Sequence, residues 1–321
     1  MPFLSFSSAS VTSFVSQTPK PKRHQHSNSI DEDLRGQRFS GVLTKKGASQ
    51  IKRLISTWDF CNEEAKKAKR ETKFASGKPW AFVTLTLPAP QRHSHKEIKR
   101  KCLNTFLITL ARKFAGVRYF WKAELQKNEN IHFHLLVDRF IAYQVIRKMW
   151  NDSISSLGYI QDYSTRAKAR YQNNFDLYYK ETKHKDRKSA EKAFHFGVST
   201  NWSSPNSTDI HNLKKVDNPA AYVSKYCAKP TSVEEIKHQK EMPDNETFGR
   251  IWGCSDSLKN LPALRIEVDT EDYTQILKHW EPHVKKTYQD EYFTTFCFDL
   301  SYFRQLRFDL LSNFSTINFL E

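Results

Sequence analysis

The chain has 321 residues, 38% of them hydrophobic, and a formal net charge of +16 at pH 7. This length suffices for one large domain or for a core domain with appendages. None of the five cysteines falls in a CxxC pair, which argues against a zinc ribbon or a disulfide framework and favours a reducing compartment. No apolar run is long enough to span a bilayer, and the first 20 residues lack the basic start of a secretion signal.

The positive charge is concentrated in the middle of the chain. Residues 56–230 carry 32 basic and 16 acidic residues, a net of +16, whereas residues 231–321 carry 10 and 16, a net of −6. Such a concentration of Lys and Arg is typical of proteins that bind phosphate backbones. A merely soluble basic surface would give the same count, so charge alone does not decide between the two.

Composition divides the chain into four regions. Residues 1–47 are rich in Ser, Pro and Lys and are predicted to be a disordered basic arm. Residues 48–79 are predicted to be a basic helical lead-in. The clearest periodicity lies in residues 80–230, which we expect to be the core domain. Residues 231–321 are a C-terminal extension to which the sequence assigns no role.

The core region alternates between strand and helix patterns. Residues 82–87 alternate polar and apolar side chains, as a half-buried strand does. The segment from Ser94 to Glu97 has the form of a capping box and opens a helix that ends at Gly116. The remaining predicted elements are strands at 117–125, 131–138 and 208–216 and helices at 141–157 and 219–229.

This order predicts an α+β fold. We expect an antiparallel sheet with a split βαβ, ferredoxin-like core and with helices on one face, because this arrangement has the same order of strands and helices. Residues 160–207 are polar and aromatic with weak periodicity, and we interpret them as a partly helical insertion. In the C-terminal extension a helix is predicted near 271–286 and an aromatic strand near 291–299.

Two histidines and a glutamate are predicted to converge on adjacent strands. His132 and His134 are two residues apart, so both point to one face, roughly 7 Å apart along the strand. The five-residue loop at 126–130 pairs Glu124 with His132, with Cβ atoms about 5 Å apart. Two imidazoles and a carboxylate suit a divalent cation and leave positions open for substrate oxygens. Surface histidines or a simple Glu–His ion pair are the alternatives.

The helix predicted at 219–229 has two different faces. One stripe carries two tyrosines and two lysines: Tyr222, Lys225, Tyr226 and Lys229. The opposite stripe is small and apolar: Ala220, Val223 and Cys227. A tyrosine can be a covalent nucleophile, and a nearby ammonium would favour its phenolate and hold a phosphate. The alternative is that the tyrosines only pack, although the small apolar stripe already supplies a packing face.

Three motifs in order resemble those of the HUH superfamily of replication initiators and relaxases, over about residues 80–255. Phe82-Val-Thr-Leu-Thr-Leu87 resembles motif one, and Glu124 with Ile131-His-Phe-His-Leu-Leu136 resembles the metal-binding motif two. Tyr222-Val-Ser-Lys-Tyr-Cys-Ala-Lys229 resembles motif three, in the two-tyrosine form of initiators of small single-stranded DNA phages. Arg250-Ile-Trp-Gly253 is similar to a segment that follows motif three in phage and plasmid initiators.

The resemblance implies a rolling-circle replication initiator that nicks single-stranded DNA at an origin. Glu124, His132 and His134 would bind Mg²⁺ or Mn²⁺. Tyr222 would attack the scissile phosphate to form a 5′-phosphotyrosine and a free 3′-OH, and Tyr226 would make the second cut, with the two alternating. The sequence does not give their order of use. Lys225 would stabilise the attacking oxygen or the phosphate charge. We expect a cytoplasmic location in a host cell, bacterial by analogy, and the sequence assigns no oligomeric state.

Two features depart from the family pattern. The chain contains no GxxxxGK[ST] motif, so we expect it to depend on a host helicase as well as a host polymerase. The insertion at 160–207 has no counterpart in the family motifs, and origin recognition is our hypothesis for it. Two other functions are kept open, namely a relaxase or single-strand transposase of the same superfamily and a non-catalytic nucleic-acid binding module.

Overall fold

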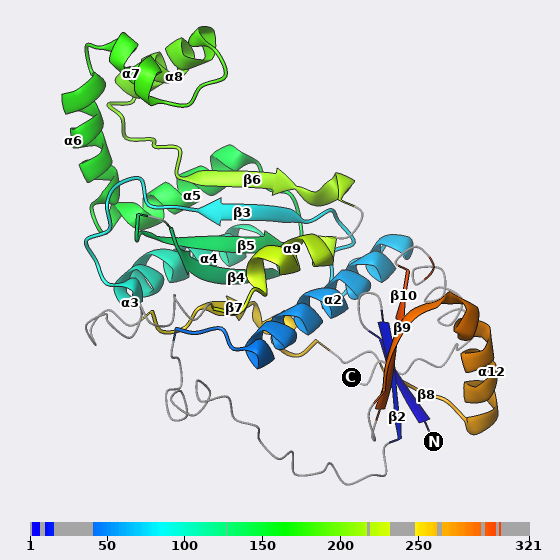
Figure 1. Cartoon of the computed structure of the whole chain (residues 1–321). Helices are drawn as coiled ribbons and strands as arrows, with labels where there is room; N and C mark the ends of the chain where they lie inside the picture. Colours follow the sequence, from blue (N-terminus) through cyan, green and yellow to red (C-terminus); the bar gives the residue numbers. More distant parts are fainter. Residues whose placement is uncertain are drawn as a thin grey trace.

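The computed structural model describes residues 2–6, 10–15, 41–126, 128–216, 219–231, 248–261, 265–289, 293–299 and 302. In this described part the chain forms two five-stranded sheets, both built from antiparallel pairs (Figure 1). None of the helices found in these ranges is both long enough and apolar enough to cross a membrane.

The first sheet is the predicted core. Its strand order is β6 (Thr208–Asn212), β3 (Ala81–Leu85), β5 (Ile131–Val137), β4 (Tyr119–Leu125) and β7 (Trp252–Cys254). Along the chain, β3, a helix, β4, β5, a second helix and β6 follow one another, which is the split βαβ arrangement. The expected α+β fold class is therefore confirmed. Strand β6 ends earlier than predicted, because a 3-10 turn occupies Leu213–Lys215.

The helix after β3 begins at the predicted cap. Ser94 Oγ accepts the backbone N–H of Glu97 at 3.2 Å, and α3 (His95–Ile98) leads through a π-helical turn at Lys99–Leu103 into α4 (Asn104–Lys113). Only half of the capping box forms, since the Glu97 carboxylate accepts from Lys101 Nζ at 2.7 Å.

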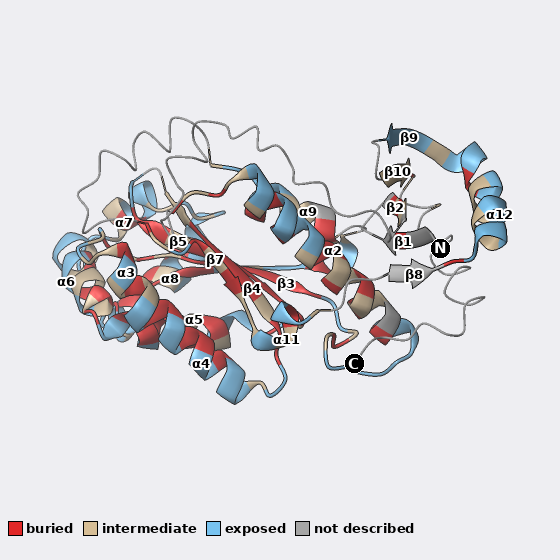
Figure 2. Cartoon of the chain, turned by 90° about the horizontal axis from the view of Figure 1, so that it is seen from below, coloured by how far each residue is buried: buried red, intermediate tan, exposed pale blue. Residues whose placement is uncertain are grey.

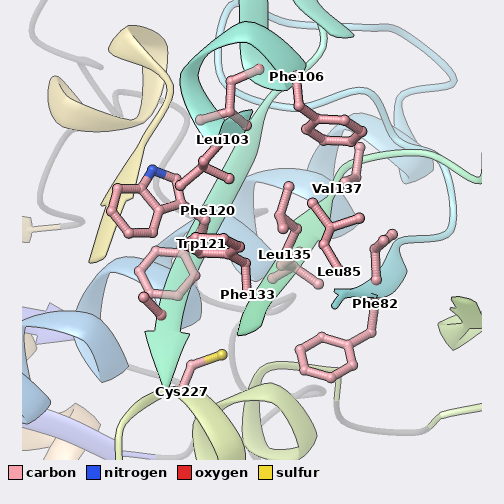
Figure 3. Close-up of a cluster of buried hydrophobic side chains, with 14 of the residues drawn as sticks. Phe82, Leu85, Leu103, Phe106, Phe120, Trp121, Phe133, Leu135, Val137 and Cys227 are labelled. Atoms are coloured by element: carbon pink, nitrogen blue, oxygen red, sulfur yellow. The ribbon is translucent and has the colours of Figure 1, made fainter. Parts of the chain in front are cut away.

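Helices cover both faces of the first sheet, so the prediction of helices on one face only was wrong. On one face, α4 and α5 (Tyr143–Ser155) pack on the strands, and the Trp150 ring of α5 lies 5.9 Å between centroids from Phe133. Against the other face lie α2 (Lys45–Lys67) and α9 (Pro219–Cys227), as Figure 2 shows. Figure 3 shows side chains of both layers, with Phe106 on one side of the strands and Cys227 on the other.

The insertion is more regular than predicted. Residues within 160–207 form three helices, α6 (Tyr159–Tyr171), α7 (Phe175–Glu181) and α8 (Arg187–Ser199), which stand clear of the sheet in Figure 1. They have a small core of their own, made of Ala167, Tyr178, Ala190, Phe194 and Trp202. The aromatic residues that weakened the periodicity of the sequence are therefore the packing residues of a helical subdomain.

The second sheet corrects two predictions. It has the order β8 (Arg265–Glu267), β1 (Pro2–Phe6), β2 (Ser10–Val15), β10 (Phe293–Phe298) and β9 (Val284–Gln289). The expectation of a disordered arm over 1–47 is wrong for β1 and β2, and also for the start of α2, while residues 16–40 lie outside the described ranges. The helix expected at 271–286 is α12 (Thr270–Trp280), and a strand follows it instead.

Long-range pairing explains these differences. Leu4 and Val11 are fully buried with Trp280 and Phe298 from the other end of the chain. Their partners are therefore more than 250 residues away, beyond the reach of local composition. Phe60 of α2 joins the same cluster, while Ile51, Ile55 and Trp58 of that helix belong to the core of the first sheet. Helix α2 thus connects the two cores.

Candidate metal and nucleophile site

The hairpin of β4 and β5 has the register predicted from its loop length. Glu124 pairs with His132, and Leu125 with Ile131. Alternation along β5 places Ile131 and Phe133 in the core under α5, while His132 and His134 are only partly buried on the opposite face. The two imidazoles and the carboxylate therefore share the face on which α9 lies.

The donor atoms of these three residues converge. His132 Nε2 and His134 Nε2 lie 3.1 Å apart, and Glu124 Oε2 is 3.5 Å from the first and 3.4 Å from the second. One ligand atom from each residue lies within 4.8 Å of the others. Two imidazole nitrogens and one carboxylate oxygen, turned toward a common point, fit a divalent cation. The arrangement leaves the remaining coordination positions to other oxygens.

A hydroxyl on the neighbouring strand orients one imidazole. Thr84 Oγ1 lies 3.2 Å from His134 Nδ1, and the two residues are directly paired between β3 and β5. When Nδ1 carries the proton and donates it to this hydroxyl, Nε2 keeps its lone pair and can serve as a ligand. Thr84 belongs to the strand assigned to motif one, so the structure gives that motif a physical contact with the histidine pair.

Lys122 is a part of the site that the sequence reasoning missed. Its side chain is buried, with 6% of the residue exposed, and Nζ donates to Glu124 Oε1 at 2.6 Å and to the backbone carbonyl of Tyr226 at 3.3 Å. Lys122 thus engages one carboxylate oxygen while the other faces the imidazoles. Its position two residues before Glu124, on the same face of the strand, was the signal that could have found it.

The charge state of Glu124 follows from these contacts. Burial by itself raises the pKa of the carboxyl, because it removes water from the charged form. Hydrogen bonds from His132 and His134 and the ammonium of Lys122 outweigh burial and hold the pKa of Glu124 far below its usual range. The group is therefore an ionised carboxylate over the whole neutral range, as a metal ligand must be.

Helix α9 presents both tyrosines to this face. Ala220, Val223 and Cys227 are buried, as the apolar stripe predicted, whereas Tyr222 is half-buried and Tyr226 is 39% exposed. The two phenol rings lie 5.3 Å apart between centroids. The ring of Tyr226 lies 6.5 Å from that of His134, so one tyrosine directly adjoins the imidazole pair.

Phe82 packs against both tyrosines and against His134. Its ring centroid is 5.3 Å from His134, 6.1 Å from Tyr222 and 5.7 Å from Tyr226. The sequence placed Phe82 in the first motif without a role. In the structure it is an apolar wall that fixes the spacing between the tyrosine helix and the imidazoles.

The surroundings of the tyrosines leave the phenols in need of activation. The pKa of Tyr222 is raised by burial, by neighbouring Tyr226 and by the carboxylate of Asp209, which pairs with Thr84 across β6 and β3. Lys225 is exposed, and its Nζ lies 6.0 Å from the ring centroid of Tyr226. The structure therefore brings Tyr222, Tyr226, Glu124, His132 and His134 to one face, with Lys225 at the outer edge.

Comparison with known proteins agrees with this arrangement. Residues 80–231 match the family model of the replication-associated protein ORF2/G2P. The matched segment contains strands β3 to β6 and helix α9. This part of the chain therefore resembles a replication-associated domain of the HUH rolling-circle type.

Other comparisons add less. The N-terminal origin-recognition/nickase domain of non-structural protein 1 from human bocavirus is a similar solved structure, at 12% identity and a TM-score of 0.25. The similarity covers 62% of this chain and 95% of that one. A search of curated proteins found no match. The assignment accordingly rests on the family match and on the geometry of the site.

Proposed function

We propose that this domain nicks single-stranded DNA at a replication origin and forms a covalent phosphotyrosine intermediate. The observation that carries the proposal is the shared face of Glu124, His132 and His134 with Tyr226, whose ring is 6.5 Å from that of His134. A tyrosine beside an open metal site can cleave a phosphodiester by covalent catalysis, because the phenol can act as the nucleophile and a bound metal can polarise the phosphate.

The metal site has a defined part in this reaction. Glu124, His132 and His134 would hold Mg²⁺ or Mn²⁺, which polarises the scissile phosphate when bound. The chain itself holds the ligands in place, since Lys122 engages one oxygen of Glu124 and Thr84 contacts His134 Nδ1. These contacts pre-arrange the donor atoms before a metal or DNA arrives.

The cleavage step exchanges one phosphoester bond for another. The phenol oxygen of a tyrosine attacks phosphorus, the bond from phosphorus to the 3′ oxygen breaks, and the DNA 5′ end becomes a phosphotyrosine. The phenol loses its proton to solvent and the departing 3′ oxygen takes one up, so a free 3′-OH remains as a primer. Lys225, on the same helix, would offset the charge of the phenolate or the phosphate.

Two tyrosines permit two successive cuts. The family resemblance implies a first attack by Tyr222 and a second by Tyr226, with the two alternating, but the sequence leaves their order open. The structure favours the reverse for a cut made from this conformation, because Tyr226 is the more exposed phenol and its ring adjoins His134. The second tyrosine would attack the regenerated origin and take the new 5′ end as a phosphotyrosine. The 3′-OH released by that cut would then attack the first phosphotyrosine, which closes the circle and frees the first phenol.

The experiment that tests the proposal is adduct formation. Single-stranded DNA of the native replicon is incubated with the protein and Mn²⁺ and analysed on a denaturing gel, where a covalent complex migrates as a slower protein band. The double variant Tyr222→Phe, Tyr226→Phe is expected to form none, and EDTA to prevent it in the wild type. The matched control is Tyr179→Phe, an exposed tyrosine of α7. DNA binding without any adduct would instead indicate a non-catalytic binding module.

A further inference from the structure

A cleft of about 530 Å³ lies outside the metal site, between α5 and the segment that connects α8 to β6. Its walls carry two large aromatic rings, Tyr143 from α5 and Phe196 from α8, which are 49% and 51% exposed. Ser203 and Ser204 of the connecting segment line the same space. Two exposed aromatic side chains in one polar cleft are the feature of a site that stacks flat, partly apolar groups.

A cationic side chain in the same cleft has an unused donor. The guanidinium Cζ of Arg147 lies 5.0 Å from the centroid of the Tyr143 ring. Its Nε is buried and has no hydrogen-bond acceptor among the described residues. Neighbouring Lys148 pairs with Asp152 at 2.8 Å, so its charge is largely compensated locally. Arg147 forms no ion pair among the described residues, so a ligand phosphate in the cleft could pair with its guanidinium.

The cleft lies at the beginning of the strand that leads to the site. The connecting segment runs from Ser204 into β6, where Asp209 pairs with Thr84 beside His134. Asp209 is five residues after Ser204, which spans at most about 18 Å of extended chain.

We propose that this cleft binds single-stranded DNA outside the metal site, with bases stacked on Tyr143 and Phe196 and a phosphate held by Arg147. The choice of DNA strand rests on the proposed function. Unpaired bases expose their faces and every base has one, so aromatic rings with a cation suit a single strand rather than a duplex. Residues 56–230 carry a net charge of +16, which favours an extended polyanion such as DNA as the ligand over a small acidic patch on another protein.

The test separates stacking from charge by using two ligands. Affinities for a short oligothymidylate and for an abasic strand of the same length are measured by fluorescence anisotropy, in EDTA so that no cleavage occurs. The double variant Tyr143→Ala, Phe196→Ala is expected to lose about tenfold per ring toward oligothymidylate. Its affinity for the abasic strand should stay within about twofold, because that strand has no bases to stack.

Arg147 is expected to contribute to DNA affinity by binding a backbone phosphate. Arg147→Ala is expected to weaken binding of both strands and to lower the slope of log affinity against log salt by about one. Matched controls are Tyr179→Ala on α7 and Arg112→Ala on α4, exposed residues that do not line this cleft. Thermal unfolding of each variant shows that the fold is retained.

The outcomes distinguish this inference from the proposed nicking activity. Wild-type affinity in the aromatic double variant, an equal loss toward the abasic strand, or the same loss in the controls would overturn the role of the cleft. Base-dependent binding that needs both rings supports the cleft even where no covalent adduct forms with Mn²⁺. Adduct formation that persists with a short substrate while the cleft variants bind normally supports nicking and refutes the cleft.

Discussion

The ammonium of Lys122 lies 2.6 Å from Oε1 of Glu124 and 3.3 Å from the backbone carbonyl of Tyr226. One buried side chain therefore contacts both a proposed metal ligand and the helix that carries the proposed nucleophiles. Because it occupies Oε1, it leaves Oε2 directed at the two imidazoles. This places the orientation of the carboxylate and the position of α9 under the control of the same residue.

We expect Lys122→Met to weaken divalent-metal binding by about tenfold to a hundredfold, the range typical of residues that orient a metal ligand. The carboxylate would lose the contact that fixes its rotamer. Isothermal titration calorimetry with Mn²⁺ measures the effect without DNA. Lys113→Met, an exposed lysine of α4, is the control, and Lys122→Arg should retain part of the affinity. Unchanged Mn²⁺ affinity in Lys122→Met would show that the ion pair does not position Glu124.

The two tyrosines are expected to differ in their single variants. In the conformation described, Tyr226→Phe should reduce the initial rate of adduct formation by at least about a hundredfold. The variant lacks the nucleophile next to His134, so only Tyr222, which is farther from the metal ligands, could attack. Tyr222→Phe should retain the first cut and lose the second. Quantifying the adduct and the released circular product over time separates the two steps. A first cut that depends on Tyr222 and not on Tyr226 would contradict this order.

The depressed pKa of Glu124 predicts that the stability of the metal-free protein depends on pH. Its folded-state pKa is depressed below the ordinary value of 4.5, so the stabilisation is complete above pH 4.5 and is lost as the pH falls toward the folded-state pKa. Glu124→Gln should lower the free energy of unfolding at pH 7 by about 1–3 kcal/mol, the cost of losing charged hydrogen bonds. The gap between wild type and variant should narrow below pH 4.5.

Urea titrations at several pH values, with EDTA present, measure this difference. Glu191→Gln on the exposed side of α8 is the control, and it should show no such gap. A gap that grows on acidification would have the wrong sign for a carboxylate with a depressed pKa.

Gly197 sets the packing of the helical insertion. A Cβ at this position would lie 2.5 Å from the ring of Trp202, which is far closer than side-chain atoms approach each other. Gly197→Ala is therefore expected to destabilise α6 to α8 by about 1–3 kcal/mol through overpacking. Hydrogen exchange should show faster exchange confined to residues 159–202, with β3 to β5 protected as before. Lys192→Ala on the same helix should leave exchange unchanged.

Local sequence was sufficient for the hairpin that carries the ligands. A five-residue loop and alternation with a period of two place Glu124 opposite His132 and put His134 on the same face. Helical periodicity likewise separated the tyrosines of α9 from the buried Val223 and Cys227. These properties depend on neighbours within a few residues, so they could be read before any tertiary contact was known.

Tertiary structure alone decided what completes the site. Nothing in the sequence indicated that Phe82 would contact both Tyr226 and His134, or that Lys122 would reach the carbonyl of Tyr226, because α9 follows these residues by about 100 positions or more. The strands at Pro2–Phe6 and Ser10–Val15 have the same explanation. Their local composition is typical of a disordered arm. They form strands because β8 and β10, from the far end of the chain, supply their hydrogen bonds and apolar partners.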